Sequence, residues 1–301
     1  MKVKPSASCT SRYIGRFAPS PTGELHFGSL VSAVASYLDA KANHGLWLVR
    51  IDDLDPPREL KGSSKKILQQ LEAHGLYSDK EVLYQSQRNK AYLSAITKLK
   101  KNNLIFRCYC SRKELKGKTS IHNYPCQSKN PTALYSLRLK IKDNVDVMFS
   151  DLYQGEQRQQ IKKEVGDIIV LRKEKIFSYN LAVVVDDAFQ QVSHVIRGSD
   201  LLKATPGQIY LQKSLELKTP IYGHIPIVVD DDGIKLSKQN LAATLDHRAP
   251  QNNLIEAINW LGLEVPIELL EANSPKQILP WAIDSWRRYS VKSIKKKSIQ
   301  I

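Results

Sequence analysis

A strand, a glycine-containing loop, a helix and a second strand follow one another near the start of the chain, and this order constrains the fold most strongly. The run Arg12–Phe17 predicts a short strand, and the run GLWLVRI at Gly45–Ile51 predicts a buried one. Between them, apolar residues recur at helical spacing from Leu30 to Leu38. Because a strand–helix–strand unit of this kind sets its strands parallel, we expect an α/β fold with a parallel sheet.

The alternation of elements continues along the chain. Apolar spacing predicts helices at Lys65–His74, Arg88–Asn103, Pro206–Leu215, Leu254–Leu261 and Pro275–Arg288. Strands are expected at Leu104–Tyr109, Tyr135–Ile141 and Ile225–Val229, and apolar segments at Asp167–Leu171, Leu181–Asp186 and Val192–Arg197 resume the α/β pattern. We interpret Cys108 to about Asp167, which opens with a polar stretch, as an insertion into the α/β core.

The charge of the chain points to an anionic partner. Lys and Arg number 45 against 30 Asp and Glu, which gives a net charge of +15. This excess favours nucleic acid first and an anionic membrane surface second, with ordinary solubility charge as the alternative. No stretch is long and apolar enough to span a membrane, and the start MKVKPSASCTSRY lacks the apolar region of a secretory signal. We therefore expect a cytoplasmic protein with no membrane partner.

The segment RFAPSPTGELHFGS at Arg16–Ser29 carries residues suited to binding phosphate, because it joins the first expected strand to the first expected helix. A helix N-terminus attracts phosphate through its free backbone N–H groups and its positive dipole end. Gly28 lets a nucleotide lie close to the backbone, and His26 can donate hydrogen bonds to phosphate oxygens. The glycine patterns of a P-loop and of a dinucleotide-binding loop are absent.

A second segment, GIKLSKQ at Gly233–Gln239, follows an expected strand as a loop. Lys235 and Lys238 flank Ser237, and the lysines can neutralise a leaving pyrophosphate. Reaction at phosphorus needs positioning and charge stabilisation more than covalent chemistry. Each segment alone is more often a turn or a solvated loop. The two segments in this order, separated by an α/β core, form a specific pattern.

These segments resemble the two signature motifs of class I aminoacyl-tRNA synthetases. HFGS at His26–Ser29 stands in the place of HIGH, and KLSKQ at Lys235–Gln239 stands in the place of KMSKS. The lead-in RFAPSPTG and the stretch RIDDLDPPRE at Arg50–Glu59 are similar to the glutamyl/glutaminyl branch. The similarity runs from about Tyr13 to Ala243, and four motifs in the family's order make it highly specific.

The resemblance implies a Rossmann-type catalytic domain, split by a zinc-bearing, acceptor-like insertion and followed by a short, mostly helical C-terminal region. The halves of this domain would be residues 1–107 and 167–215, the insertion 108–166, and the loop region with the helical stem and basic tail 216–301. ATP, with Mg²⁺, and L-glutamate would form glutamyl-adenylate, and the glutamyl group would pass to RNA. The residues implied for catalysis are His26, Gly28, Ser29, Lys235, Ser237 and Lys238, of which His26, Gly28 and Lys238 bind ATP.

A pocket for glutamate needs fixed cations and one anion, because the substrate has two carboxylates and an amine. In the family, the residue at the position of Arg16 binds the side-chain carboxylate of the substrate. Arginine suits this role because its guanidinium can donate two parallel hydrogen bonds to one carboxylate. The resemblance places Asp52 at the amine, where the family usually has Glu, and water or Asp53 could compensate for the shorter side chain. Outside this context, Tyr179 would be a half-buried tyrosine and Arg197 a surface ion pair. The glutamate-binding residues implied are Arg16, Phe17, Ala18, Pro19, Ser20, Asp52, Tyr179 and Arg197.

Three of the four cysteines lie close together in the sequence, at Cys108, Cys110 and Cys126, with His122 between them. In a cytosolic chain such a cluster indicates a metal site rather than disulfides. Thiolates and imidazole suit Zn²⁺, and four ligands close a tetrahedral structural site. Tyr124 is a rival fourth ligand, and reduced cysteines without metal are the alternative. In the short relatives that the chain resembles, the position of His122 carries a tyrosine.

The short distance from the second motif to the end of the chain separates two kinds of relative. A full glutamyl-tRNA synthetase has a large anticodon-binding region, and the residues from Lys238 to Ile301 are too few to form one. The chain therefore resembles the truncated paralogues, which activate glutamate without tRNA and attach it to queuosine. The partners implied are L-glutamate and the queuosine-carrying anticodon stem-loop of tRNA(Asp), bound by a monomer in a salt-sensitive complex.

Two other functions stay open. A truncated synthetase could charge the 3′ end of tRNA(Glu) and leave anticodon reading to a separate partner. A non-catalytic paralogue could bind nucleotide or RNA, although the presence of Arg16, His26, Arg197 and Lys238 argues against this. The basic tail Arg287–Lys297 either contacts RNA or is a solvated end.

Overall fold

The parallel sheet predicted from the start of the sequence is present in the structure. A computed structural model describes residues 12–110, 114, 122, 134–228, 245–246, 248–271 and 274–288. The strands of the sheet form a group of three, β1 (Ile14–Phe17), β2 (Leu46–Ile51) and β3 (Leu83–Tyr84), and a group of two beside it, β9 (His194–Gly198) and β10 (Ile221–Ile225). β2 pairs parallel with β1 and β3, and β9 pairs parallel with β10. The backbone N–H of Ser193 donates to the carbonyl of Ile14 at 2.9 Å, so β9 begins beside β1.

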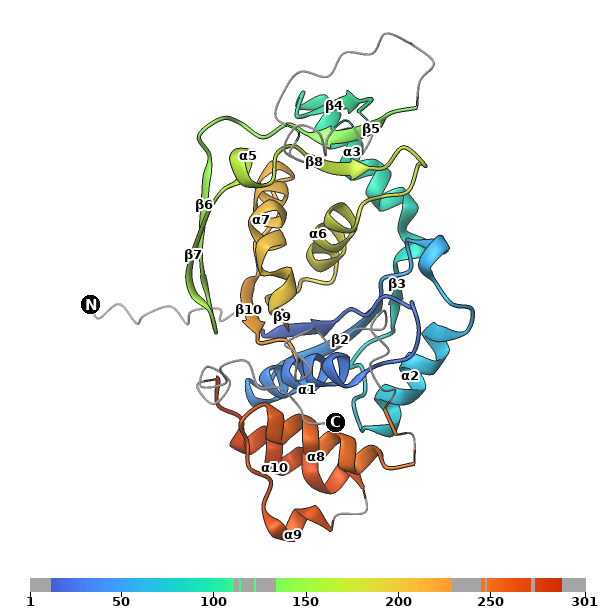
Figure 1. The fold of residues 1–301 in the computed structure, drawn as a ribbon, viewed down its shortest axis with the longest axis vertical. Coiled ribbons are helices and arrows are strands. Elements are labelled where there is room, and N and C mark those ends of the chain that lie inside the picture. The colour runs from blue at the N-terminus through green and yellow to red at the C-terminus, as the bar shows by residue number, and fades with distance from the viewer. Residues whose placement is uncertain are drawn as a thin grey trace, which may run out of the picture.

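Helices cover both faces of this sheet (Figure 1). On one face, α1 (Phe27–Ala42) packs with the C-terminal helices α8 (Pro250–Trp260) and α10 (Pro275–Ser285). On the other face lie α6 (Tyr179–Phe189) and α7 (Thr205–Ser214). Each face has its own cluster of buried apolar side chains, and successive residues of β1 and β2 are therefore buried rather than alternately exposed.

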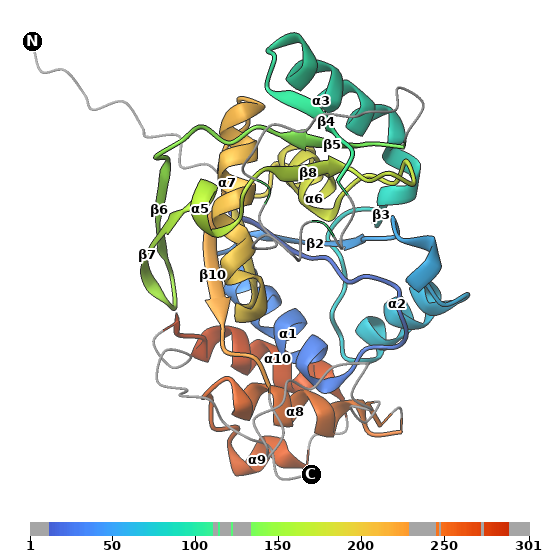
Figure 2. The ribbon, with the colours of Figure 1, turned by 45° about the horizontal axis from the view of Figure 1, so that its top comes forward.

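Between the halves of the parallel sheet, the chain forms an antiparallel sheet and a long hairpin (Figures 1 and 2). The antiparallel sheet contains β4 (Ile105–Cys108), β5 (Ser136–Leu139) and β8 (Ile168–Leu171). The hairpin consists of β6 (Asp146–Asp151) and β7 (Gly155–Gln160), and its tip reaches β10. There the backbone N–H of Leu152 donates to the carbonyl of Tyr222 at 3.0 Å. The hairpin therefore connects this part of the chain to the edge of the parallel sheet.

Four more helices and three 3₁₀ turns are present in the described part of the chain. The remaining helices are α2 (Ser63–Ala73), α3 (Asn89–Lys101), α5 (Ile161–Glu164) and α9 (Ile267–Leu270), and the 3₁₀ turns are Pro56–Arg58, Gln85–Arg88 and Ser199–Ala204. Within the described ranges, no helix combines the length and the apolar character needed to cross a membrane. The expected α/β class, with a mostly helical C-terminal region, is confirmed.

The structure shows what the later apolar segments form. Residues 168–171 form a strand that pairs antiparallel with β5 and lies outside the parallel sheet, and Leu181–Asp186 lies within α6. One assignment needs correction, because the strand expected at Ile225–Val229 lies earlier, at Ile221–Ile225. The β10 strand was misplaced because Gly223 and His224 interrupt its apolar pattern. The hairpin of β6 and β7 was not predicted, because DVMFSD does not alternate apolar and polar residues and GEQRQQ has no apolar side chain.

One partly buried histidine at this sheet gives a prediction about stability. The ring of His194 stacks on Tyr13 with centroids 3.9 Å apart, and burial, helped by Arg288, lowers its pKa from 6.5 to about 4. Because the unfolded chain takes up this proton near pH 6.5 and the folded chain does not, stability contributed by neutral His194 is lost as pH falls. We expect His194→Gln to weaken the fall in unfolding free energy between pH 6.5 and 4 by about 1 kcal/mol, allowing for partial exposure. Urea unfolding of both proteins across that range measures the difference, and identical slopes would contradict the assignment.

Candidate functional site

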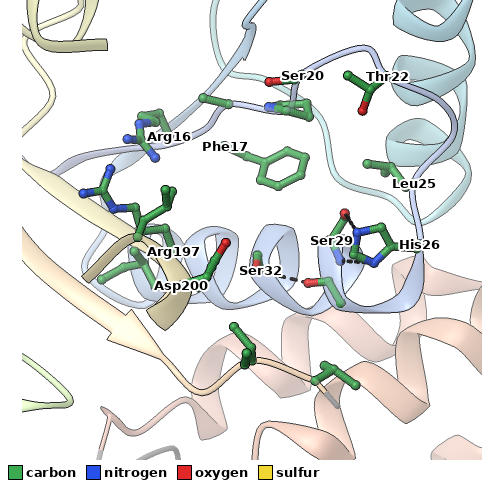
Figure 3. Close-up of a pocket in the computed structure, with 18 of the residues that line it drawn as sticks. Arg16, Phe17, Ser20, Thr22, Leu25, His26, Ser29, Ser32, Arg197 and Asp200 are labelled. Atoms are coloured by element: carbon green, nitrogen blue, oxygen red, sulfur yellow. Dashed lines mark hydrogen bonds between the residues drawn. The ribbon is translucent and has the colours of Figure 1, made fainter. Parts of the chain in front are cut away.

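A cavity of about 400 Å³ opens at the carboxyl ends of β1 and β9, where ligands bind in open α/β sheets (Figure 3). It lies between the start of α1 and the segments that follow β9 and β10. The lining residues are Arg16, Phe17, Ala18, Pro19, Ser20, Thr22, Leu25, His26, Gly28, Ser29, Ser32, Tyr179, Ile196, Arg197, Gly198, Asp200, Leu201, Pro226, Ile227 and Val228. The structure therefore brings together ten of the residues that the sequence analysis selected, from three separate parts of the chain.

Two buried arginines, Arg16 and Arg197, lie on the same side of the cavity (Figure 3). Arg16 donates to Asp187, with Nε–Oδ1 and Nη2–Oδ2 distances of 3.2 and 3.4 Å. The Nη2 of Arg197 donates to Thr205 Oγ1 and Gln208 Oε1, both at 2.8 Å. Its Nη1 is buried and has no hydrogen-bond partner among the described residues. Because a buried N–H without a partner is costly, this side of the cavity suits an anion.

The opposite side of the cavity holds the N-terminus of α1 (Figure 3). His26 is the N-cap residue, and its Nδ1 accepts from the backbone N–H of Ser29 at 3.3 Å. The Ser29 hydroxyl lies 3.0 Å from His26 Nε2. A Cβ on Gly28 would lie 3.2 Å from the His26 ring, so glycine keeps both the ring and the helix end in place. This arrangement sets an imidazole beside the positive end of a helix, which suits the binding of phosphate.

Asp52 lies behind the cavity wall and is not among the residues that line it. Its Oδ1 accepts from Arg50 Nε at 2.8 Å, and its Oδ2 has no hydrogen-bond partner in the described part of the chain. Its backbone N–H donates to the carbonyl of Pro19, which does line the cavity, at 3.0 Å. Burial raises the pKa of Asp52 to about 6, against the opposing effect of Arg50. The carboxylate that directly lines the cavity is Asp200.

Asp187 forms ion pairs with both Arg16 of β1 and Arg50 of β2. It accepts from Arg50 Nη1 at 2.6 Å and from Arg16. Although burial opposes it, these two guanidinium groups hold the pKa of Asp187 below its usual value. Asp187 therefore stays ionised and fixes the direction of Arg16.

Besides Thr22, which lies within the RFAPSPTG segment, sequence reasoning missed two further polar residues in the wall, Ser32 and Asp200 (Figure 3). Ser32 lies one helical turn after Gly28, and its hydroxyl donates to the Gly28 carbonyl at 3.1 Å. Asp200 follows the carboxyl end of β9, three residues after Arg197. Both could have been found from their spacing relative to residues already selected. The segment with Lys235, Ser237 and Lys238 lies outside the described residues.

The predicted metal ligands Cys108, Cys110 and His122 come together in space. One ligand atom from each lies within 4.8 Å of the others. The Nδ1 of buried His122 is 3.0 Å from Asp167 Oδ2, so the nitrogen that a metal would take is Nε2. Two sulfurs and one imidazole are a donor set that fits Zn²⁺. Cys126 and the rival ligand Tyr124 lie outside the described residues.

Known proteins resemble this chain in sequence and in fold. The family model described as tRNA synthetases class I (E and Q), catalytic domain, matches residues 14–266. Two proteins named glutamyl-Q tRNA(Asp) synthetase, one from Ectopseudomonas mendocina and one from Pseudomonas aeruginosa, are each 44% identical in sequence to this chain. The matches cover 91% and 92% of this chain and 93% and 94% of theirs.

A solved protein structure is similar to this chain in its fold. It is a glutamate tRNA ligase from Elizabethkingia meningosepticum in complex with its amino acid, and it is 22% identical with a TM-score of 0.79. The match covers 95% of this chain and 66% of that one, so this chain spans just under two thirds of that protein's length.

Proposed function

This chain belongs to the class I tRNA synthetases of the glutamate and glutamine type, and on that premise we propose that it activates L-glutamate with ATP. As in the name of its relatives, glutamyl-Q tRNA(Asp) synthetase, the glutamyl group then passes to queuosine in the anticodon of tRNA(Asp). Glutamyl-adenylate is the intermediate, and no tRNA is needed to form it. The observation that carries the proposal is the cavity, with two buried guanidinium groups on one side and a helix N-terminus capped by His26 on the other.

Glutamate is recognised through its side-chain carboxylate, which accepts hydrogen bonds from Arg16 and Arg197. Both groups are buried and preorganised, so they favour a charged, bidentate acceptor. Glutamine would turn an NH₂ donor toward one of these donors and leave buried N–H groups unpaired, which disfavours it strongly. Phe17, Ala18, Pro19, Ser20 and Tyr179 complete the pocket wall.

The substrate ammonium needs negative charge near the cavity. Asp200 supplies it at the wall, and Asp52 supplies it from behind Pro19, from where it reaches the amine through water. With a pKa of about 6, Asp52 is mostly ionised at neutral pH. The shorter side chain of Asp52, compared with the usual Glu, is thus offset by a second carboxylate.

Adenylate formation joins a substrate carboxylate oxygen to the α-phosphorus of ATP, and the bond to pyrophosphate breaks. ATP brings Mg²⁺, which neutralises phosphate charge. His26 and Lys238 stabilise the developing charge on the phosphate oxygens, and Gly28 lets the nucleotide approach the helix end. Ser29, Lys235 and Ser237 hold the phosphates in position.

We expect Gly28→Ala to separate activity from stability. The added methyl presses on the His26 ring, 3.2 Å away, and occupies the approach of the nucleotide. We expect kcat/KM for ATP to fall about 10- to 100-fold, since sub-ångström misplacement of reacting groups is costly. The unfolding free energy should change by no more than about 1 kcal/mol in either direction, because the preference of alanine over glycine in helices opposes the close contact with the ring. Steady-state exchange kinetics and urea unfolding measure both, and unchanged ATP kinetics would contradict the placement of ATP.

Transfer to queuosine follows from the chemistry of the acceptor. A hydroxyl of its cyclopentenediol attacks the glutamyl carbonyl, and AMP leaves. The curated relatives match this chain over nearly their whole length, which favours the short paralogue over a full synthetase that charges the 3′ end. The net charge of +15 suits an RNA partner.

We also propose that the protein is a cytoplasmic monomer. The two halves of its catalytic domain are residues 1–107 and 167–215, the insertion is 108–166 and the C-terminal region is 216–301.

The metal is structural in this proposal. Cys108, Cys110 and His122 hold Zn²⁺ together with Cys126, and four protein ligands leave no position for water. Asp167 fixes the His122 ring through Nδ1. Zinc there stabilises the insertion and takes no part in the activation of glutamate.

Pyrophosphate exchange tests the first half of the reaction directly. With ATP and labelled pyrophosphate, we expect exchange that depends on glutamate and needs no tRNA. Glutamine in place of glutamate should give little or no exchange. Absence of exchange with glutamate would remove the proposed function and favour a non-catalytic paralogue.

A further inference from the structure

Asp151 and His224 form a buried pair behind Arg197. The Nδ1 of His224 lies 2.6 Å from Asp151 Oδ2, and its Nε2 lies 3.0 Å from Arg197 Nε. All three residues are at most 5% exposed. Asp151 comes from the tip of the hairpin of β6 and β7, whereas Arg197 and His224 come from β9 and β10. A carboxylate outside the parallel sheet thus contacts, through one imidazole, an arginine of the cavity wall.

The protons of this pair follow from its partners. An arginine can only donate, so His224 Nε2 must accept from Arg197 Nε. The Thr205 hydroxyl, also 3.0 Å from Nε2, donates to the carbonyl of Leu201. His224 is therefore neutral and carries its proton on Nδ1, which donates to Asp151. Burial and Arg197 both lower the pKa of His224, in agreement with this state.

Asp151 is itself held firmly by the backbone. Its Oδ1 accepts from the backbone N–H groups of Tyr153, Gln154 and His224, each at 3.0 Å. Gln154 Nε2 also donates to the carbonyl of His224 at 2.8 Å. Because three backbone N–H groups hold Oδ1, the carboxylate of Asp151 has one fixed orientation, and its Oδ2 faces His224. The hairpin tip and β10 thus define where the imidazole points.

We propose that Asp151 and His224 are positioning residues that hold Arg197 in the orientation that binds the substrate carboxylate. Asp151 selects the Nδ1–H form of His224, and the lone pair on Nε2 fixes Arg197 Nε. With Nε and Nη2 engaged, Nη1 is the nitrogen that meets the ligand. The inference rests on the proposed function, because it takes glutamate as the ligand of Arg197. It also means that the hairpin outside the parallel sheet contributes to the amino-acid pocket.

Asp151→Asn tests the proposal with almost no change in shape. The three backbone donors keep the amide oxygen in the place of Oδ1, so the amide NH₂ faces His224 Nδ1. The imidazole proton must then move to Nε2, where it opposes Arg197 Nε–H. We expect KM for glutamate to rise about tenfold or more, with kcat and KM for ATP within about threefold, since hydrogen bonds to charged groups are among the stronger ones. Asp146→Asn, in an exposed pair with Arg158 on the same hairpin, is the control and should change none of these.

Two variants at His224 separate positioning from packing. His224→Gln can place an amide oxygen near Nε2 and should keep KM for glutamate closer to the wild-type value than His224→Leu, which has no acceptor. Equal glutamate KM values in both variants, or an unchanged KM in Asp151→Asn, would overturn the proposal. Absence of glutamate-dependent exchange in the wild-type protein would instead overturn the proposed function, and with it this role of Arg197.

The tautomer of His224 gives a readout that needs no activity. In ¹⁵N spectra of histidine-labelled protein, assigned by the signal missing from His224→Gln, we expect a protonated Nδ1 in the wild type. In Asp151→Asn the proton should appear on Nε2. A wild-type His224 protonated on Nε2 would overturn the proposal whatever the kinetics show.

Discussion

Replacement of Arg16 by alanine is expected to reduce kcat/KM for glutamate in pyrophosphate exchange by about 10²- to 10³-fold, the range for truncating one partner of a buried charge pair. Arg16 is 4% exposed and held against Asp187, so its guanidinium is already oriented in the cavity before the substrate arrives. Without Arg16, the substrate carboxylate loses a bidentate hydrogen-bond donor. Asp187 keeps its ion pair with Arg50, whose Nη1 lies 2.6 Å from Asp187 Oδ1. Arg16→Lys keeps a charge but not the bidentate donor, and we expect a smaller loss.

The control for Arg16 is Arg158→Ala, because Arg158 also forms an ion pair but lies exposed on the hairpin. Its exchange kinetics should match the wild type. Thermal unfolding of Arg16→Ala and Arg16→Lys shows whether each variant is still folded. A loss of less than about fivefold in Arg16→Ala, with folded protein, would exclude Arg16 as a main ligand of the substrate carboxylate.

Replacement of Cys110 by serine is expected to remove zinc from the protein. We expect about one equivalent of zinc in the purified wild type and about 0.2 or less in the variant, because a structural tetrahedral site needs all its ligands. Three ligand atoms already lie within 4.8 Å, and Asp167 orients His122, so most of the site is preformed. Because metal binding stabilises the folded state, we expect Tm to fall by about 5 °C or more. Metal analysis and calorimetry measure the two effects.

Three further variants test which residues belong to the metal site. His122→Ala should lose zinc as Cys110→Ser does, whereas Tyr124→Phe should keep it, because imidazole is the more common zinc ligand. Cys9→Ser changes a cysteine far from the others in sequence and should also keep the metal. A wild-type protein without zinc would contradict the metal assignment. Zinc retained in His122→Ala but lost in Tyr124→Phe would transfer the fourth ligand to Tyr124.

Local sequence patterns predicted the parts of the fold that are formed by neighbouring residues. The order of β1, α1 and β2 follows from apolar spacing over residues 12–51, and Arg16, His26 and Gly28 lie within this one unit. Cys108, Cys110 and His122 were predicted for a similar reason, because they lie in one short stretch. In both cases the chemistry of the residues and their spacing belong to a single segment.

Pairs distant in the sequence could not be predicted in this way. Asp187 contacts Arg16 and Arg50, and Asp151 contacts His224, across separations that no local pattern encodes. Tyr179 and Arg197 were selected only through the family resemblance, since neither stands out in its own segment. Arg50 and Asp52 are only two residues apart, but their contact was not predicted either, because it depends on the burial of both side chains in the fold.

The position of the transferred glutamate tests the central claim most directly. Labelled glutamate, ATP and the protein are incubated with tRNA(Asp) that carries queuosine and with tRNA(Asp) that lacks it. We expect label only in the queuosine-containing tRNA, and we expect it to stay on the RNA after the 3′-terminal nucleotide is removed. Equal labelling of both tRNAs, lost with the 3′ end, would show a synthetase that charges the acceptor end and would contradict the account.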